Sequence, residues 1–121
     1  MAMNTITQTR IRRTVKTVVE MLVNADYEAL EALTGGVRLR SEHIESGVID
    51  YGKTLTSPPE YAYDDIDVVE VAGKAAPEYS IRFRLFTEEE GQSDLELQAT
   101  LVDENGNAPE MRVEIDNIIV A

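Results

Sequence analysis

Three closely spaced aspartates are the residues of this chain whose types and spacing best suit acid–base chemistry. Asp64, Asp65 and Asp67 precede or open an expected β-strand. Paired carboxyl groups can act as general acid and base where burial raises the pKa of one of them. Asp67 is the most interesting of the three, because strand alternation can turn it inward. An acidic run at a strand entrance is, however, more often a solvated loop.

The other candidates for catalysis are a histidine and two tyrosines. His43 is the only histidine and lies near the start of an expected helix, a position that is usually exposed. Tyr51 and Tyr63 could line a pocket mouth, although tyrosines beside a sheet more often cap the core with their hydroxyls in water. With Asp67 these residues are the catalytic candidates, and they form no recognisable catalytic set.

One stretch has the spacing of a calcium-binding loop. Asp103, Asn105 and Asn107 occupy positions 1, 3 and 5, and Glu114 stands at position 12. Position 6 is Ala108 instead of glycine, and both flanks have the pattern of strands. An asparagine–glycine hairpin turn explains the same residues. No phosphate-binding glycine loop or nucleotide fingerprint is present, so we expect neither a metal nor a cofactor.

The charge of the chain is strongly uneven. Its 121 residues include 11 Lys and Arg against 23 Asp and Glu, a net charge of −12. Residues 1–19 carry +4, so residues 20–121 carry −16. This acidity argues against nucleic acid as a ligand and permits a basic protein partner. Glu88, Glu89 and Glu90, with Asp64 and Asp65, could dock its basic side chains, although solubility is the commoner explanation of such charge.

Composition also limits the class of protein. The chain contains no cysteine, which excludes disulfides, thiolate zinc sites and cysteine nucleophiles. No apolar stretch approaches the ~20 residues of a membrane helix, and we find no secretory signal. We expect a single cytoplasmic domain over 1–121 that does not bind membranes.

Helical periodicity dominates the first part of the chain, with helices expected over about 5–52. Steps of four, three and four residues separate the apolar residues of one stripe, which predicts a helix over about 5–23. The basic side chains of this helix should mostly face away from the stripe. The stripe consists of Ile11, Val15, Val18 and Leu22.

Two shorter helices are expected to follow. Asn24 is a candidate N-cap for the first of them, and Gly35-Gly36 would end it. Ser41 is a candidate cap for the second, over about 42–52. The segment 54–60 contains two prolines and is expected to be a loop. The interruption at Asn24 is therefore interpreted as a corner between helices.

After Pro59 the apolar period changes to two, which predicts an antiparallel sheet over about 64–120 with one buried face. The doublets Val68-Val69 and Ile118-Ile119 break this alternation and indicate bulges or strands buried on both faces. Four strands are expected, around Ile66–Val71, Tyr79–Leu85, Leu95–Leu101 and Met111–Val120.

The hairpin around residues 88–92 has a predictable register. Symmetric closure would place Arg84 opposite Glu96 and Arg82 opposite Gln98 on the polar face. An exposed pair of this kind contributes at most about 1 kcal/mol but helps to fix the register.

This α+β pattern resembles the nuclear-transport-factor-2-like and cystatin-like superfamily, and short uncharacterised bacterial domains. The resemblance rests on the helix corner at Asn24–Leu33, the short third helix and the hairpins Tyr79–Leu101 and Leu95–Val120. It implies two to three N-terminal helices packed on the concave face of a four-stranded antiparallel meander. The wider group includes isomerases, dehydratases, ligand binders, scaffolds and immunity-type proteins, so the resemblance does not choose an activity.

Three functions remain open at the level of the sequence. The first is a small, acidic, non-catalytic interaction protein of the immunity kind, engaging a basic protein partner. The second is a small-molecule-binding or isomerase-like cup, which requires a closed apolar pocket of ~300 Å³ or more. The third is a homodimer that associates through its sheet. The lack of a nameable catalytic set favours the first.

Overall fold

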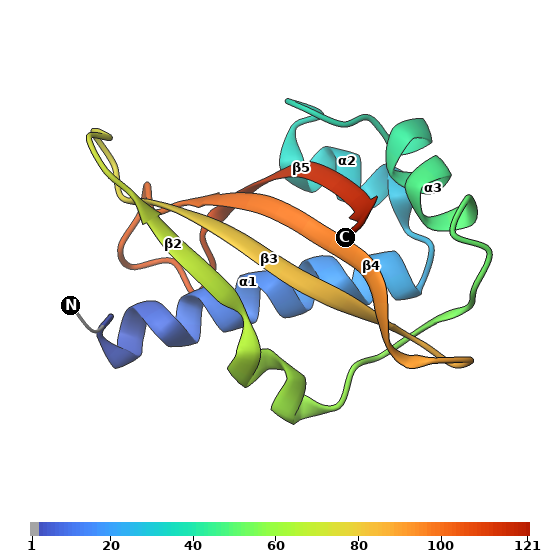
Figure 1. Ribbon diagram of the computed structural model, residues 1–121. Coiled ribbons are helices and arrows are strands. Elements are labelled where there is room, and N and C mark those ends of the chain that lie inside the picture. Colours follow the sequence, from blue (N-terminus) through green and yellow to red (C-terminus); the bar gives the residue numbers. More distant parts are fainter. Residues whose placement is uncertain (1–2) are drawn as a thin grey trace.

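The computed structural model describes residues 3–121, which form helices followed by an antiparallel sheet (Figure 1). The α-helices are α1 (Thr5–Val23), α2 (Tyr27–Thr34) and α3 (Ser41–Ile49), and η1 (Glu60–Asp65) is a 3-10 helix. The strands are β1 (Leu55–Thr56), β2 (Asp67–Val71), β3 (Glu78–Thr87), β4 (Gly91–Val102) and β5 (Arg112–Val120). This arrangement confirms the predicted α+β class.

Helix α1 has the predicted bounds and buried stripe. The side chain of Asn4 caps its start by accepting a hydrogen bond from the Thr7 N–H at 2.8 Å. The apolar stripe from Ile11 to Leu22 is buried against the sheet. The prediction that the basic residues face outward is wrong for Arg10, which is only 7% exposed.

The second helix begins two residues later than predicted, since its N-cap is Asp26 and not Asn24. Asn24 does not cap α2. It ends α1 instead, and its N–H donates to the carbonyl of Glu20. Ala25 then takes a left-handed conformation with φ 57°, and α2 begins after Asp26. Gly35, with φ 73°, ends α2 as predicted.

The third helix is shorter than predicted. It ends at Ile49, and Gly52, with φ 77°, forms a turn by donating its N–H to the Ile49 carbonyl. Ser41 is the first helical residue, not the cap. Ile44 and Val48 form the buried side.

The sheet has five strands, so the predicted count of four is one short. Its order is β1-β3-β4-β5, and β2 pairs with the same edge of β3 as β1 does, further along that strand. The additional strand β1 lies in the segment expected to be a loop. It pairs with β3 at Phe86 and Thr87. The η1 helix carries the chain from β1 to β2 and was also not predicted.

The predicted hairpin register is confirmed. Arg84 lies opposite Glu96, and Arg82 lies opposite Gln98. The nearest carboxylate to Arg84, however, is that of Asp94, at 3.6 Å.

The two apolar doublets behave differently. The β2–β3 register is regular from Asp67 to Val71, so the expected irregularity at Val68-Val69 is wrong; Val69 simply faces solvent. On β5 the register shifts by one residue, which leaves Asp116 as a bulge just before the second doublet.

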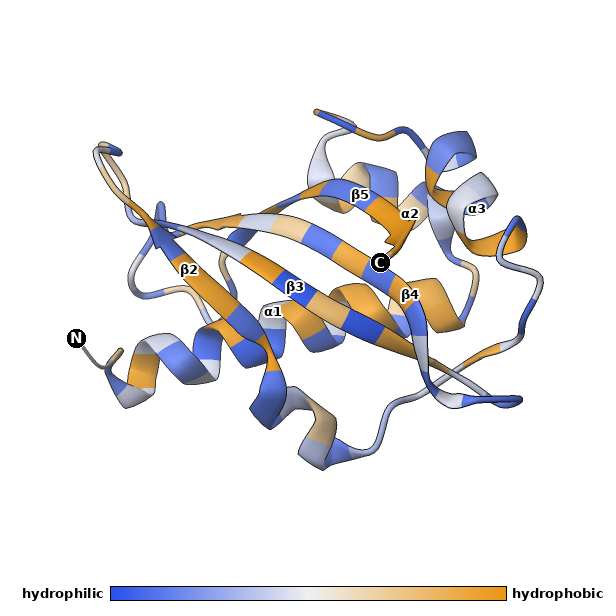
Figure 2. Ribbon diagram, viewed as in Figure 1, coloured by the Kyte–Doolittle hydropathy of each residue, from blue (hydrophilic) through white to orange (hydrophobic). Residues whose placement is uncertain are grey.

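The sheet buries one face and exposes the other. Figure 1 shows α1 running along one face of the sheet, with α2 and α3 near β5. Figure 2 shows hydrophobic and hydrophilic residues alternating along β3 and β4. Ile81, Phe83, Leu95 and Leu97 are all at least 96% buried, so the helices cover the apolar face as expected.

Glu114 on β5 should make stability depend on pH. Hydrogen bonds from Arg112 and then Arg38 hold its pKa below the ordinary 4.5, against the opposing effect of burial. A carboxylate with a lowered pKa stabilises the fold at neutral pH, and this contribution disappears as the pH falls through the folded-state value. We expect Glu114→Gln to be less stable than wild type at pH 7 and to approach it in acid. Urea denaturation at both pH values measures this, and Glu88→Gln, which removes an exposed carboxylate that makes no ion pair within residues 3–121, is the control.

Candidate functional site

The acidic hairpin tip is bound to its own chain. Glu89 accepts hydrogen bonds from the N–H and the hydroxyl of Thr54, both at 2.9 Å, and the N–H bond lowers the pKa of Glu89. Glu90 accepts a hydrogen bond from the Tyr51 hydroxyl at 3.0 Å. Glu88 is exposed. Two of the three glutamates predicted to dock a partner therefore hold the residues before β1 in place.

Asp64 is likewise engaged within the chain. It pairs with Arg12, and the neighbouring Glu60 pairs with Lys16. Arg12 also donates to the backbone carbonyl of Glu60 at 2.9 Å. Asp65 is exposed and makes no ion pair within residues 3–121. The basic residues of α1 thus neutralise acids of η1.

Arg10 links the first half of α1 to the β4–β5 loop. Its guanidinium lies 2.8 Å from Asp103 and donates to the carbonyls of Asn105 at 2.8 Å and Ala108 at 2.9 Å. Of the four basic residues in α1, only Arg13 makes no ion pair within residues 3–121. The basic residues of the segment 1–19 therefore mostly neutralise acidic residues elsewhere in the same chain.

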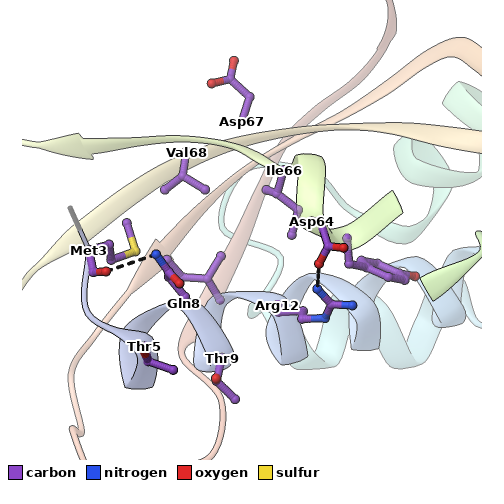
Figure 3. Close-up of a pocket in the computed structure, with 11 residues that line it drawn as sticks. Met3, Thr5, Gln8, Thr9, Arg12, Asp64, Ile66, Asp67 and Val68 are labelled. Atoms are coloured by element: carbon purple, nitrogen blue, oxygen red, sulfur yellow. Dashed lines mark hydrogen bonds and ion pairs between the residues drawn. The ribbon is translucent and has the colours of Figure 1, made fainter. Parts of the chain in front are cut away.

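A groove of about 610 Å³ lies between the first half of α1 and β2 (Figure 3). The ion pair of Arg12 and Asp64 closes one end of it, and Gln8 and Thr9 stand on its α1 wall. Its apolar lining consists of Met3, Ile11, Ile66 and Val68.

Asp67 does not turn into this groove. Figure 3 shows its carboxylate pointing away from α1, whereas Val68 points toward the groove. The strand period is correct, but the inward position belongs to Val68, which packs against the core. The prediction of an inward Asp67 is therefore wrong, and the isomerase-like interpretation loses its proposed base.

The remaining catalytic candidates do not gather in one place. Tyr63 is 97% buried; its ring stacks on Phe83 with centroids 5.1 Å apart. Burial, and then the carboxylates of Glu20 and Glu60, raise the pKa of Tyr63, so its hydroxyl is a poor proton donor. His43 is exposed on α3, as expected.

A second hollow, of about 530 Å³, lies on the open face of the sheet. Carboxylates of Asp65, Asp67 and Glu96 share its lining with the guanidinium groups of Arg82 and Arg84. Because charges of both signs are interspersed there, this face attracts a basic partner less strongly than a purely acidic surface would.

A groove of about 380 Å³ between α2 and α3 is different, because its lining contains four acids and no basic residue. All four acids are exposed, and none makes a side-chain hydrogen bond or ion pair within residues 3–121. We name this hollow the acidic groove. Its charged residues are Asp26, Glu28, Glu42 and Glu45.

Local sequence explains how the acidic groove is built. Glu28 and Glu42 lie in the first turns of α2 and α3, where the helix dipole favours acids and offsets their mutual repulsion. Tyr27 lies in the wall; burial and then the nearby carboxylate of Glu45 raise its pKa. The sequence analysis did not predict this groove. The sequence feature that could have revealed it is a pair of short predicted helices that each have acidic residues in the first turn.

Within residues 3–121 no three His, Asp or Glu side chains are grouped so that they could hold a metal ion. Asp103 and Glu114 of the calcium-like spacing are paired with arginines. Among the same residues, no helix has both the length and the hydrophobicity to cross a lipid bilayer.

Comparison with known proteins places most of the chain in one family. Residues 19–121 match the family model described as Domain of unknown function (DUF7668). This match includes the acidic groove and begins within α1, after the residues that form the α1 wall of the groove beside β2. No curated protein and no solved structure matches the chain. The chain therefore belongs to the DUF7668 family.

Proposed function

We propose that this protein is a non-catalytic interaction protein whose acidic groove engages basic side chains of a protein partner. The observation that carries the proposal is the groove itself, a hollow lined by four carboxylates and by no Lys or Arg. Elsewhere on the described chain, many acids already have partners: Arg12 holds Asp64, and Thr54 holds Glu89. The carboxylates of the groove are available.

The physical chemistry of the groove favours a cation. Four like charges around one hollow repel each other, and a bound ammonium or guanidinium group would relieve that repulsion. Its volume of about 380 Å³ can admit a Lys or Arg side chain. The ring of Tyr27 in the wall adds an aromatic surface suited to a cation. An immunity-type role, in which a basic protein is held and blocked, is one such function.

Calorimetric titration with an octalysine peptide tests the proposal. Glu42→Gln combined with Glu45→Gln should weaken binding about tenfold, since two exposed pairs contribute roughly 0.5–1 kcal/mol each. Raising the salt concentration should weaken wild-type binding.

The matched control removes two charges elsewhere. Asp65→Asn combined with Glu88→Gln changes the net charge equally at exposed positions outside the acidic groove. It should bind octalysine nearly as wild type does. If both double variants lost the same amount of octalysine affinity, the binding would depend only on the net negative charge of the protein. That result would refute a specific role for the acidic groove.

A second candidate function is small-molecule binding in the groove between α1 and β2. Its volume of about 610 Å³ favours this alternative, and so does its mixed lining, in which apolar side chains lie beside polar and charged ones that could orient a ligand. Gln8→Trp, at an exposed position whose side chain lies between α1 and β2 (Figure 3), should fill the groove without disturbing the core. A compound found by ligand-observed NMR screening should lose binding to this variant. Retained binding would place the compound elsewhere.

A further inference from the structure

The two edges of the sheet are protected differently. At β5, the backbone of α3 approaches so closely that a Cβ atom on Gly47 would lie 3.1 Å from the carbonyl oxygen of Ile118. Arg38, from the α2–α3 loop, also reaches β5, where it pairs with Glu114 and Asp116. Helix α3 and the α2–α3 loop therefore cover this edge.

The opposite edge is formed largely by β2 and is open. Within residues 3–121, β2 pairs with β3 alone, and its backbone makes no other hydrogen bond (Figure 1). Asp67, Val69 and Glu70 are exposed, Val69 to 60%. The strand has no proline, lysine or bulge; of the devices with which proteins commonly block such an edge, it has only a short length of five residues and the two carboxylates of Asp67 and Glu70.

We propose that β2 pairs antiparallel with β2 of a second copy of this chain, with Val69 on the two-fold axis. In such a pair, facing residues lie on the same side of the sheet, so the axis must pass through a residue. An axis at Asp67 or Glu70 would set like charges directly opposite each other, which is unfavourable. An axis at Val68 would use only residues 67–69 of the strand, with Asp67 opposite Val69 and Val68 opposite its own copy.

The Val69 register uses the whole strand. Asp67 lies opposite Val71, Val68 opposite Glu70, and Val69 opposite its own copy. No like charges face each other directly, and the exposed surface of Val69 becomes a contact between β-branched side chains, which favour strands. The two sheets join into one continuous sheet.

Dimerisation goes beyond the proposed function and leaves it intact. Because α2 and α3 lie beside β5, on the opposite side of the sheet from β2, both acidic grooves stay accessible in the dimer. The dimer then offers two grooves to a partner, which increases avidity for a partner with two basic segments. The copies carry −12 each, so salt should strengthen dimerisation. Salt has the opposite effect on octalysine binding.

Sedimentation equilibrium of the full chain at low and moderate salt tests the proposal. Wild type should dimerise, more tightly at higher salt, and Val69→Lys should weaken dimerisation at least about fivefold. Val37→Lys is the matched control, because Val37 is 62% exposed in the α2–α3 loop and the charge change is the same. A wild-type monomer at all salt concentrations, or equal effects of both lysines, would overturn the proposal.

Cysteine cross-linking tests the register. The chain has no native cysteine. Val69→Cys should form a dimer disulfide on mild oxidation, because directly opposed residues lie within disulfide range. Glu70→Cys should cross-link poorly, since its copies sit on the diagonal about 7–8 Å apart. Faster cross-linking of Glu70→Cys would refute the Val69 axis, and neither result depends on octalysine binding.

Discussion

Arg10→Ala is expected to lower the free energy of unfolding by about 3 kcal/mol. Its guanidinium is buried against Asp103 and donates to two carbonyls of the β4–β5 loop. Removing one partner of a buried ion pair commonly costs about 3–5 kcal/mol, because the other charge stays behind unpaired. Asp103 is 17% exposed, which places the expected cost at the lower end. Urea denaturation with a constant m-value measures the loss.

Arg13→Ala is the matched control. Arg13 lies three residues further along α1, is exposed and makes no ion pair within residues 3–121. Its truncation should change stability by less than about 0.5 kcal/mol. Similar losses in the two variants would show that Arg10 does not hold the β4–β5 loop.

Tyr63→Ala is expected to cost a similar amount, roughly 3–4 kcal/mol, as for other large aromatic residues in cores. The ring stacks on Phe83, and the cationic groups of Arg12 and Lys16 lie about 6.0 and 5.9 Å from its centroid. Truncation would leave a cavity under η1. It would also remove the ring that contacts Phe83 and the cationic groups of Arg12 and Lys16. Thermal and urea denaturation measure the cost.

Tyr63→Phe separates the ring from the hydroxyl. The hydroxyl is buried and has no hydrogen-bond partner within residues 3–121. Its removal should change stability by less than about 1 kcal/mol. If the phenylalanine variant were as unstable as the alanine variant, the hydroxyl would carry a contact that this account denies.

The features that the sequence predicted best are those set by local periodicity. The apolar stripe of α1, the glycine end of α2 and the Arg84–Glu96 register follow from spacing and turn residues alone. These depend on neighbours in the chain. They needed no knowledge of how distant segments meet.

The errors come from contacts between distant segments. The helical period alone places Arg10 on the surface of α1, because nothing nearby in the chain shows that the β4–β5 loop supplies Asp103 and two carbonyls as its partners. The strand β1 lies beside the hairpin tip, where Glu89 holds Thr54, thirty-five residues away in the chain. A short strand held by a distant side chain leaves no periodic signal.

The candidate site was only partly predictable for the same reason. The acidity that favours a basic partner can be counted in the sequence, and this led to the hairpin tip and to Asp64. Which acids remain free depends on where the arginines and hydroxyls lie. In the folded chain Asp64 pairs with Arg12 and Glu89 accepts hydrogen bonds from Thr54, whereas Glu42 and Glu45 lie unpaired in the acidic groove.

Amide chemical-shift mapping with octalysine tests the central claim, that the acidic groove is where this protein binds basic groups. We expect the largest shifts at residues 25–29 and 41–45, which line the groove, with their loss in the double variant Glu42→Gln and Glu45→Gln. Shifts centred on residues 88–90 or 64–67, or spread evenly over the acidic surface, would contradict it.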